Sequence, residues 1–379
     1  MAIDTSWRAP ETVTHPRESM RGLWRVVQPF LTWVTGVPLE GDRPRVKWRP
    51  VLASLAGVAQ TAIGVAIGSV FFFFPSLWTV PLLAVSWLTT AGGMRRLDVV
   101  VVHQTLHRMF ARTARGNRVV SEVVTTFLWR RPYDPNRREH LLHHAFPCSL
   151  RDEDTLYLRS TGARPGMTAQ EFNRYLWRAT VSPKHHWGFF WSRLKGNYTP
   201  RQRPYRFAMS LVFLAGTVAV LAATGLWIPW LVLWVVPASV FFQAHTFLYT
   251  LSEHRWWLFD NAEGLVKAER DQLTFGRFCG EPAPGRGSGA RAWARWWLRM
   301  VFVHAPYRLL VLVGDTVQHD LHHVRPKCEW ANSSFVRNQD IMDGSDRYYE
   351  VWGTLLDHVR AANAVLDTSV RRSERVQVR

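Results

Sequence analysis

The sequence predicts an all-α integral membrane protein, in which four transmembrane helices form two hairpins beneath a cytoplasmic helical cap. Three observations lead to this prediction: two long apolar runs without charged residues, many basic residues beside those runs, and histidines gathered in three short clusters. The chain has 379 residues and a formal net charge of +18. A charge of this sign suits nucleic acid or an anionic membrane surface, and the apolar runs favour the membrane over nucleic acid.

Each apolar run is long enough for two membrane crossings. Residues 51–94 contain no acidic residue, no basic residue and no histidine, and residues 207–252 contain a single histidine. One crossing needs about 20 apolar residues. Proline and glycine interrupt each run near its middle, in "FPSLWTVP" and "TGLWIPW", which indicates a tight turn at each point. The predicted spans are residues 51–73, 77–94, 207–225 and 229–250.

The charges beside the hairpins predict their orientation. Neither hairpin tip carries Lys or Arg, whereas the flanking "GDRPRVKWRP", "MRRLD" and "TPRQRPYR" are basic. By the positive-inside rule, both termini and the long middle segment are cytoplasmic, and in a bacterium the membrane would be the inner, plasma membrane. We therefore expect a cytoplasmic N-terminal segment without a signal peptide but with room for an interfacial helix, then a membrane domain, then a C-terminal helix with a polar tail. These three parts are residues 1–50, 51–345 and 346–379.

Two further segments have the composition of helices that lie along a membrane surface. Both "WGFFWSRLKG" and "RAWARWWLRM" place tryptophans beside basic residues. His185 and His186 precede the first of these tryptophan-rich segments, and we interpret them as interfacial residues.

The histidines are strongly clustered along the chain. The pentapeptides "HQTLH", "HLLHH" and "HDLHH" hold 8 of the 15 histidines, whereas random placement would put about 0.6 there. Within each pentapeptide the spacing is three or four residues, so the imidazoles share one face of a helix. The predicted topology puts all three clusters on the cytoplasmic side. We therefore expect one composite site, formed by His103, His107, His140, His143, His144, His319, His322 and His323.

Eight imidazoles exceed the ligand number of a single metal ion. One zinc takes four ligands, and a catalytic zinc takes three from protein, so the set implies two metals. Neutral imidazole suits Zn, Cu, Fe and Ni, and the ligand type alone does not select iron. Glu139, Glu253 and Asp320 each adjoin a histidine, which makes them candidate acceptors that fix imidazole tautomers.

With three histidine boxes in this order and the hairpins interleaved between them, the chain resembles the membrane fatty acid desaturase and hydroxylase superfamily. The stretch "WRRPYDPNRREHLLHH" also resembles the approach to the second box of that family, and the resemblance covers roughly residues 50–345. It implies that the eight histidines bind two irons, which activate O2 at the cytoplasmic membrane face. The family usually adds a ninth ligand near the end of the fourth span. We expect His254 in "SEHRWW" to supply it, with His245 in "QAHTF" as the alternative.

The activity that the resemblance implies is O2-dependent insertion of a double bond into a lipid acyl chain. Hydroxylation or ketolation of a lipid or carotenoid is the close alternative, because it shares the first C–H cleavage. A histidine-rich metal transporter is less favoured, because such proteins usually carry polar ligands inside their spans. A zinc hydrolase is also less favoured, because HExxH is absent from the sequence.

The electrons for such a reaction must come from another protein. The sequence contains no Rossmann glycine fingerprint and no CxxC pair, so no reductase module is recognisable in the chain. We expect a separate ferredoxin, rubredoxin or cytochrome with its reductase. A basic cytoplasmic face would suit an acidic carrier.

Overall fold

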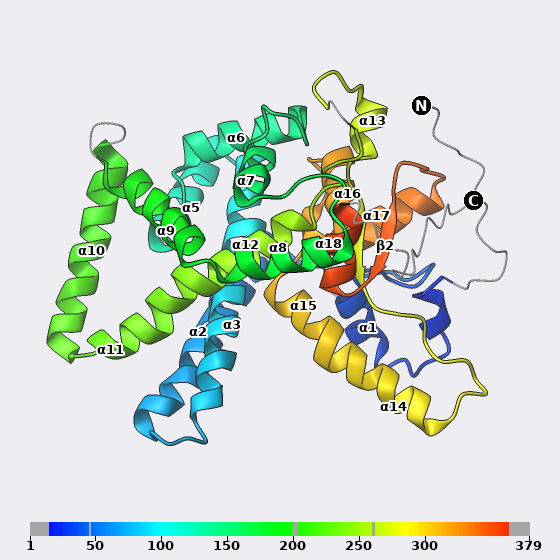
Figure 1. Cartoon of the computed structure of the whole chain (residues 1–379), viewed down its shortest axis with the longest axis horizontal. Helices are drawn as coiled ribbons and strands as arrows, with labels where there is room; N and C mark the ends of the chain where they lie inside the picture. Colours follow the sequence, from blue (N-terminus) through cyan, green and yellow to red (C-terminus); the bar gives the residue numbers. More distant parts are fainter. Residues whose placement is uncertain (1–14, 45–46, 200–203, 260–261, 364–379) are drawn as a thin grey trace.

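The computed structural model describes residues 15–44, 47–199, 204–259 and 262–363. Helices predominate in these residues, as the sequence predicts. Figure 1 shows two helical hairpins whose tips lie on one side of the molecule, with α6 and α7 on the opposite side. Among these described residues, three helices are long and apolar enough to cross a membrane by length and composition: Pro50–Phe73, Pro204–Thr224 and Trp227–Leu251.

The first hairpin consists of α2 (Pro50–Phe73) and α3 (Val80–Arg96). Its helices pack closely because small residues line the contact. A Cβ atom on Gly64 would lie 2.5 Å from the backbone nitrogen of Thr90, so only glycine allows this approach. The apolar helix α3 has 17 residues and continues directly through a π-helical segment, Leu97–Val102. Its assignment as the second span stays a prediction.

The second hairpin joins α10 (Pro204–Thr224) to a long interrupted helix through Gly225, which has φ +70°. The interrupted helix contains α11 (Trp227–Trp230), two π-helical segments and α12 (Phe242–Leu251). Most side chains of α10 face outward, and Val212 is 74% exposed. An apolar helix exposed to this extent is suited to lipid and not to water.

The cap is built from short helices that follow the first and second hairpins. Figure 1 shows α8 and α18 near the middle of the molecule and α14 at its lower edge. The cap helices, with the N-terminal α1, are α1 (Gln28–Thr35), α4 (His103–Leu106), α5 (Ala114–Phe127), α6 (Tyr133–Ala145), α7 (Glu153–Thr161), α8 (Ala169–Val181), α9 (Pro183–Tyr198), α13 (Lys267–Asp271), α14 (Ala290–Arg299), α15 (Ala305–Leu310), α16 (His319–Val324), α17 (Ser333–Met342) and α18 (Leu355–Ala362).

The cap contains a strand pair that corrects the all-α prediction. Strand β1 (Gly276–Cys279) pairs in parallel with β2 (Glu350–Gly353). Two strands of four residues that lie far apart in the sequence carry no periodic signal of their own. Their pairing depends on the packing of the cap, so local patterns do not predict it.

Residues 15–44, which belong to the predicted N-terminal segment, pack against the cap. Met20, Leu31 and Val34 are fully buried in the largest apolar core, which also contains Val317 and Phe278. The predicted C-terminal helix corresponds to α18. The predicted polar tail lies outside the described residues.

Candidate metal centre

The structure brings nine histidines together in two adjacent groups. The first group takes members from all three histidine boxes, and its ring nitrogens lie within 4.8 Å of one another. The second group adds His254, from the loop after α12, to members of the second and third boxes. The first group is His103, His107, His140, His144 and His322. The second group is His143, His254, His319 and His323.

Helix geometry explains how each box reaches the site. The rod that begins as α3 continues through the π-helical segment into α4, which carries His103 and ends beside His107. His103 lies seven residues beyond Arg96, which is about 10 Å at the rise of an α-helix. Helices α6 and α16 bring the second and third boxes to the same place.

Adjacent histidines point into different groups. His143 lies in the second group and His144 in the first, while His322 lies in the first and His323 in the second. Neighbouring side chains on a helix diverge by about 100°, so one short helix can serve two sites. This partition follows from the doublet that ends the second and third boxes.

The first group converges on a single point. His140 Nε2 lies 2.6 Å from His107 Nε2 and 3.1 Å from His144 Nε2, which in turn lies 2.9 Å from His322 Nε2. A neutral imidazole nitrogen carries at most one proton, so His140 and His144 cannot each satisfy two such neighbours by hydrogen bonding. Lone pairs that converge in this way are suited to a cation.

The second group has the same character. His254 Nε2 lies 2.9 Å from His143 Nε2 and 3.1 Å from His319 Nε2. His323 Nε2 is buried and has no hydrogen-bond partner in the part of the chain that the structure describes. Two nitrogens bound to one metal at about 2.1 Å, with 90° between them, lie about 3.0 Å apart. The observed separations fit this value, so the residues present fit a metal in each group.

The electrostatics of the groups also suit metal ligands. Burial lowers the pKa of every clustered histidine except His143, and for His107 the value falls to about 4. These imidazoles are therefore neutral and have a free electron pair for a metal.

His143 is held by a carboxylate that the sequence analysis missed. Burial alone would lower the pKa of His143, but the Asp152 carboxylate raises it to about 10. Asp152 Oδ1 lies 3.1 Å from His143 Nδ1, and both side chains are buried. Because the carboxylate accepts from Nδ1–H, Nε2 is left as the ligand atom. Asp152 is the N-cap of α7, and the only signal in the sequence was its position eight residues beyond the second box.

The three predicted acceptors differ in their positions. Glu253 Oε1 lies 3.6 Å from His319 Nε2. Asp320 instead accepts hydrogen bonds from Nε and Nη2 of the buried Arg337, and Glu139 pairs with Arg131. Neither Asp320 nor Glu139 has a histidine among its ion-pair partners in the described part of the chain. Arg337 also donates to Glu350 on β2 at 2.7 Å, so Asp320 anchors α16 to the strand pair.

The remaining histidines lie outside both groups. His245 is buried within the fourth predicted span, and its Nδ1 has no hydrogen-bond partner. His185 contacts the Tyr157 hydroxyl at 2.8 Å. His358 contacts the carbonyl oxygen of Val351 at 3.1 Å.

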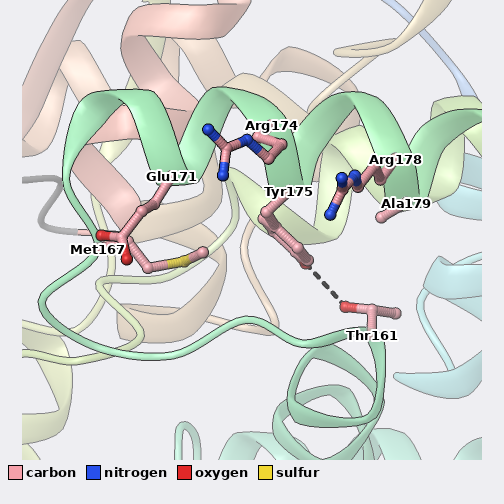
Figure 2. Close-up of a pocket in the computed structure, with 7 residues that line it drawn as sticks. All are labelled: Thr161, Met167, Glu171, Arg174, Tyr175, Arg178 and Ala179. Carbon is pink, nitrogen blue, oxygen red and sulfur yellow. Dashed lines mark hydrogen bonds between the residues drawn. The ribbon is translucent and has the colours of Figure 1, made fainter.

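The surface pocket in Figure 2 is not part of the centre. It has a volume of about 270 Å³, and α8 supplies most of its lining. Figure 2 shows Arg174 and Arg178 one turn apart along α8, and a hydrogen bond between Tyr175 and Thr161. None of its lining residues belongs to the histidine groups.

Comparison with known proteins agrees with this geometry. A family model described as Fatty acid desaturase matches residues 81–353, which include all nine clustered histidines. The chain belongs to the fatty acid desaturase family. The family match begins within α3 and ends at the last residue of β2, so it covers the cap of this desaturase-family protein from α4 to β2, whereas α1 and α18 lie outside it. No curated protein matches the chain.

Proposed function

We propose that this protein is a di-iron membrane oxidoreductase that inserts a double bond into a lipid acyl chain. The observation that carries the proposal is the convergence of nine imidazoles into two adjacent groups beyond the ends of apolar hairpins. An alkyl C–H bond is unreactive toward every amino-acid side chain, so the chemistry requires a cofactor. Two bound irons would supply it by activating O2 and removing two hydrogen atoms from the chain.

The residues of the chain hold and orient this centre. The first group would bind one iron and the second group the other, with Asp152 fixing the tautomer of His143. His319 and His254 are buried, so these two members of the second group lie away from bulk water. An acyl chain that reaches His103 must leave the bilayer by about 10 Å, given the rise of the helix beyond Arg96. The cap therefore has to enclose the chain and not only contact the membrane.

Lipid mass spectrometry of cells with and without expression tests the reaction. We expect a product that lacks two hydrogen atoms in cells that express the protein, and none with His323→Ala at matched membrane expression. A product that gains one oxygen atom would assign hydroxylation and overturn desaturation. Iron should be near two per chain, and a zinc-only protein would contradict both reactions.

A separate acidic electron carrier is proposed to dock on a basic surface next to the first group. A pocket of about 270 Å³ is lined by Arg108, Arg115, Arg118 and Arg137, together with Tyr133 and Asp134. Asp134 pairs with Arg118, so the lining keeps an excess of three positive charges. In the same pocket, Arg137 Nε donates to the Leu106 carbonyl oxygen at 3.0 Å, one residue from a candidate ligand. Complementary charge mainly increases the association rate and weakens with salt.

Charge reversal at Arg115 tests the docking proposal. Arg115→Glu should slow product formation with a reduced ferredoxin, rubredoxin or cytochrome. The difference between the wild-type and variant rates should become smaller as added salt slows the wild type. Iron content should stay at the wild-type value, because Arg115 contacts no clustered histidine. Arg174→Glu on α8 is the matched control. Equal rates for Arg115→Glu and wild type at low salt would exclude this surface.

The proposed topology places both termini and the metal centre on the cytoplasmic side, with four spans. It is supported by the basic flanks and by hairpin tips that lie opposite α6 (Figure 1). A membrane-impermeant thiol reagent should label Ser76→Cys from the outer side and Asn136→Cys only after the membrane is opened. The native cysteines are buried, so the background is low. Outer labelling at position 136 would refute the topology.

A further inference from the structure

Three arginine side chains surround the ring of Phe242 where the first hairpin meets the cap. The guanidinium carbons of Arg193, Arg130 and Arg95 lie 4.6, 5.1 and 5.9 Å from the centroid of this ring. They come from α9, from the loop after α5 and from the end of α3. Three separate parts of the fold therefore deliver positive charge to one place outside the histidine groups.

The positive charge of this arginine cluster is not balanced by protein carboxylates. Arg130 pairs with Asp98 at 3.0 Å, and Asp98 is 6% exposed. Arg95 and Arg193 are 1% and 3% exposed, and neither forms an ion pair with any residue that the structure describes. Arginine stays protonated in proteins, so the cluster keeps an excess of two positive charges. Buried charge of this kind is unfavourable without a counter-ion.

Several N–H groups in the cluster also lack an acceptor. Arg193 donates through Nη1 to the Ala238 carbonyl oxygen, and Arg95 donates through Nη1 to Thr246 Oγ1. The Nε and Nη2 groups of both side chains are buried and have no partner among the described residues, and the same is true of Nε of Arg130. Contact with an aromatic face stabilises the face of a guanidinium and leaves its in-plane N–H groups unsatisfied. A ligand with anionic oxygens would satisfy both the charge and the hydrogen bonds.

We infer that the arginine cluster binds the anionic end of a single-chain lipid, a carboxylate or a phosphate. Guanidinium N–H groups match the oxygens of both anions. The cluster lies at the basic end of α3, where the first hairpin meets the cap, and its rings Phe242 and Phe189 provide an apolar surface beside the charge. The side chain of Arg130 is 20% exposed, so the cluster reaches the surface at this residue.

A chain of contacts links the cluster to the second histidine group. Arg95 lies over the ring of Tyr249 at 4.6 Å, and Tyr249 shares a hydrogen bond with Glu253. Glu253 Oε1 in turn lies 3.6 Å from His319 Nε2. A lipid anchored at the cluster would therefore have its charged end near the metal centre. The inferred binding depends on the arginines, and its test does not depend on the proposed reaction.

Thermal unfolding of the full chain in an uncharged detergent tests the inference without metal or turnover. The midpoint should rise with palmitate by about 2 °C or more and should not rise with hexadecanol, which has the same chain without the charge. Inorganic phosphate, compared with chloride at matched ionic strength, tests the free anion. A rise with palmitate assigns a lipid anion, and a rise with phosphate alone assigns a free anion to the same cluster.

Two variants decide whether the arginines are responsible. Arg193→Met and Arg130→Gln should each abolish the rise, whereas Arg174→Gln, an exposed arginine of α8, should keep it. Arg130 is partly exposed, so its replacement is the safer test if Arg193→Met does not fold. The inference is overturned if neither anion raises the wild-type midpoint, or if Arg130→Gln shows the full rise. A variant that loses the rise in midpoint but still oxidises lipid would separate this site from the proposed function, and so would a variant that keeps the rise but no longer oxidises lipid.

Discussion

Asp152→Asn should weaken iron binding by about tenfold while leaving the fold intact. In the structure the carboxylate accepts a hydrogen bond from His143 Nδ1 at 3.1 Å in a buried site. A hydrogen bond to a charged group contributes about 1.5–3 kcal/mol and a neutral one about 0.5–1.5 kcal/mol. The difference, about 1–1.5 kcal/mol, corresponds to about a tenfold change in affinity. Effects of tenfold to hundredfold are typical for partners of metal-bound histidines.

The amide oxygen can keep the helix cap, but the amide nitrogen would replace Oδ2, which accepts from the Cys148 backbone N–H and from the Thr155 hydroxyl, both at 3.1 Å. The thermal midpoint measures the stability lost with these two hydrogen bonds. Asp152 Oδ1 accepts from the Asp154 backbone N–H at 3.0 Å as the N-cap of α7, and asparagine caps helices about as well. The assay is Fe(II) binding to metal-stripped protein in competition with a chelator, together with the thermal midpoint. Asp154→Asn is the matched control, because its carboxylate lies 3.7 Å from His143 Nδ1, beyond hydrogen-bond distance. Wild-type iron affinity in Asp152→Asn would refute the role assigned to this carboxylate.

Three further predictions test the site and the hairpins. His254→Ala should lose iron and product, whereas His245→Ala should keep iron, because His254 lies in a histidine group and His245 does not. Iron loss with His245→Ala but not with His254→Ala would reverse the assignment. Gly64→Val should lower the thermal midpoint, because the new Cβ would meet the Thr90 backbone and overpacking costs about 1–3 kcal/mol. Gly216→Val on α10 is the control, because a Cβ at that position meets nothing within 4 Å. Removing metal with a chelator should lower the midpoint while circular dichroism keeps its helical signal, because the bilayer or detergent maintains the spans; loss of most helix would contradict this.

The hairpins could be predicted from sequence because their signal is local. An uncharged run, a turn and a second run are readable without knowledge of the rest of the chain, and the observed helix ends differ from the predicted ones by a few residues. The three histidine boxes are local in the same sense. Their spacing places the imidazoles on one helix face before any tertiary contact is known.

Only the tertiary structure decided which histidines share a group and what holds them. His107 meets His140, and His143 meets His254, across separations that no periodic pattern describes. Asp152 is a further case: it caps α7 through local contacts, but only the tertiary structure brings its carboxylate to the His143 imidazole.

The arginine cluster shows the same division between local and long-range information. In the sequence, Arg95 belongs to the basic flank "MRRLD", Arg130 to the approach to the second histidine box and Arg193 to a tryptophan-rich segment, and no local pattern groups the three. The packing of α3, the loop after α5 and α9 brings them around Phe242 and buries their charge. The sequence by itself therefore determined the apolar helices of the two hairpins and the candidate metal ligands, because these depend on composition and helical period. The structure decided the pairings, because burial and charge compensation depend on residues that are distant in the chain.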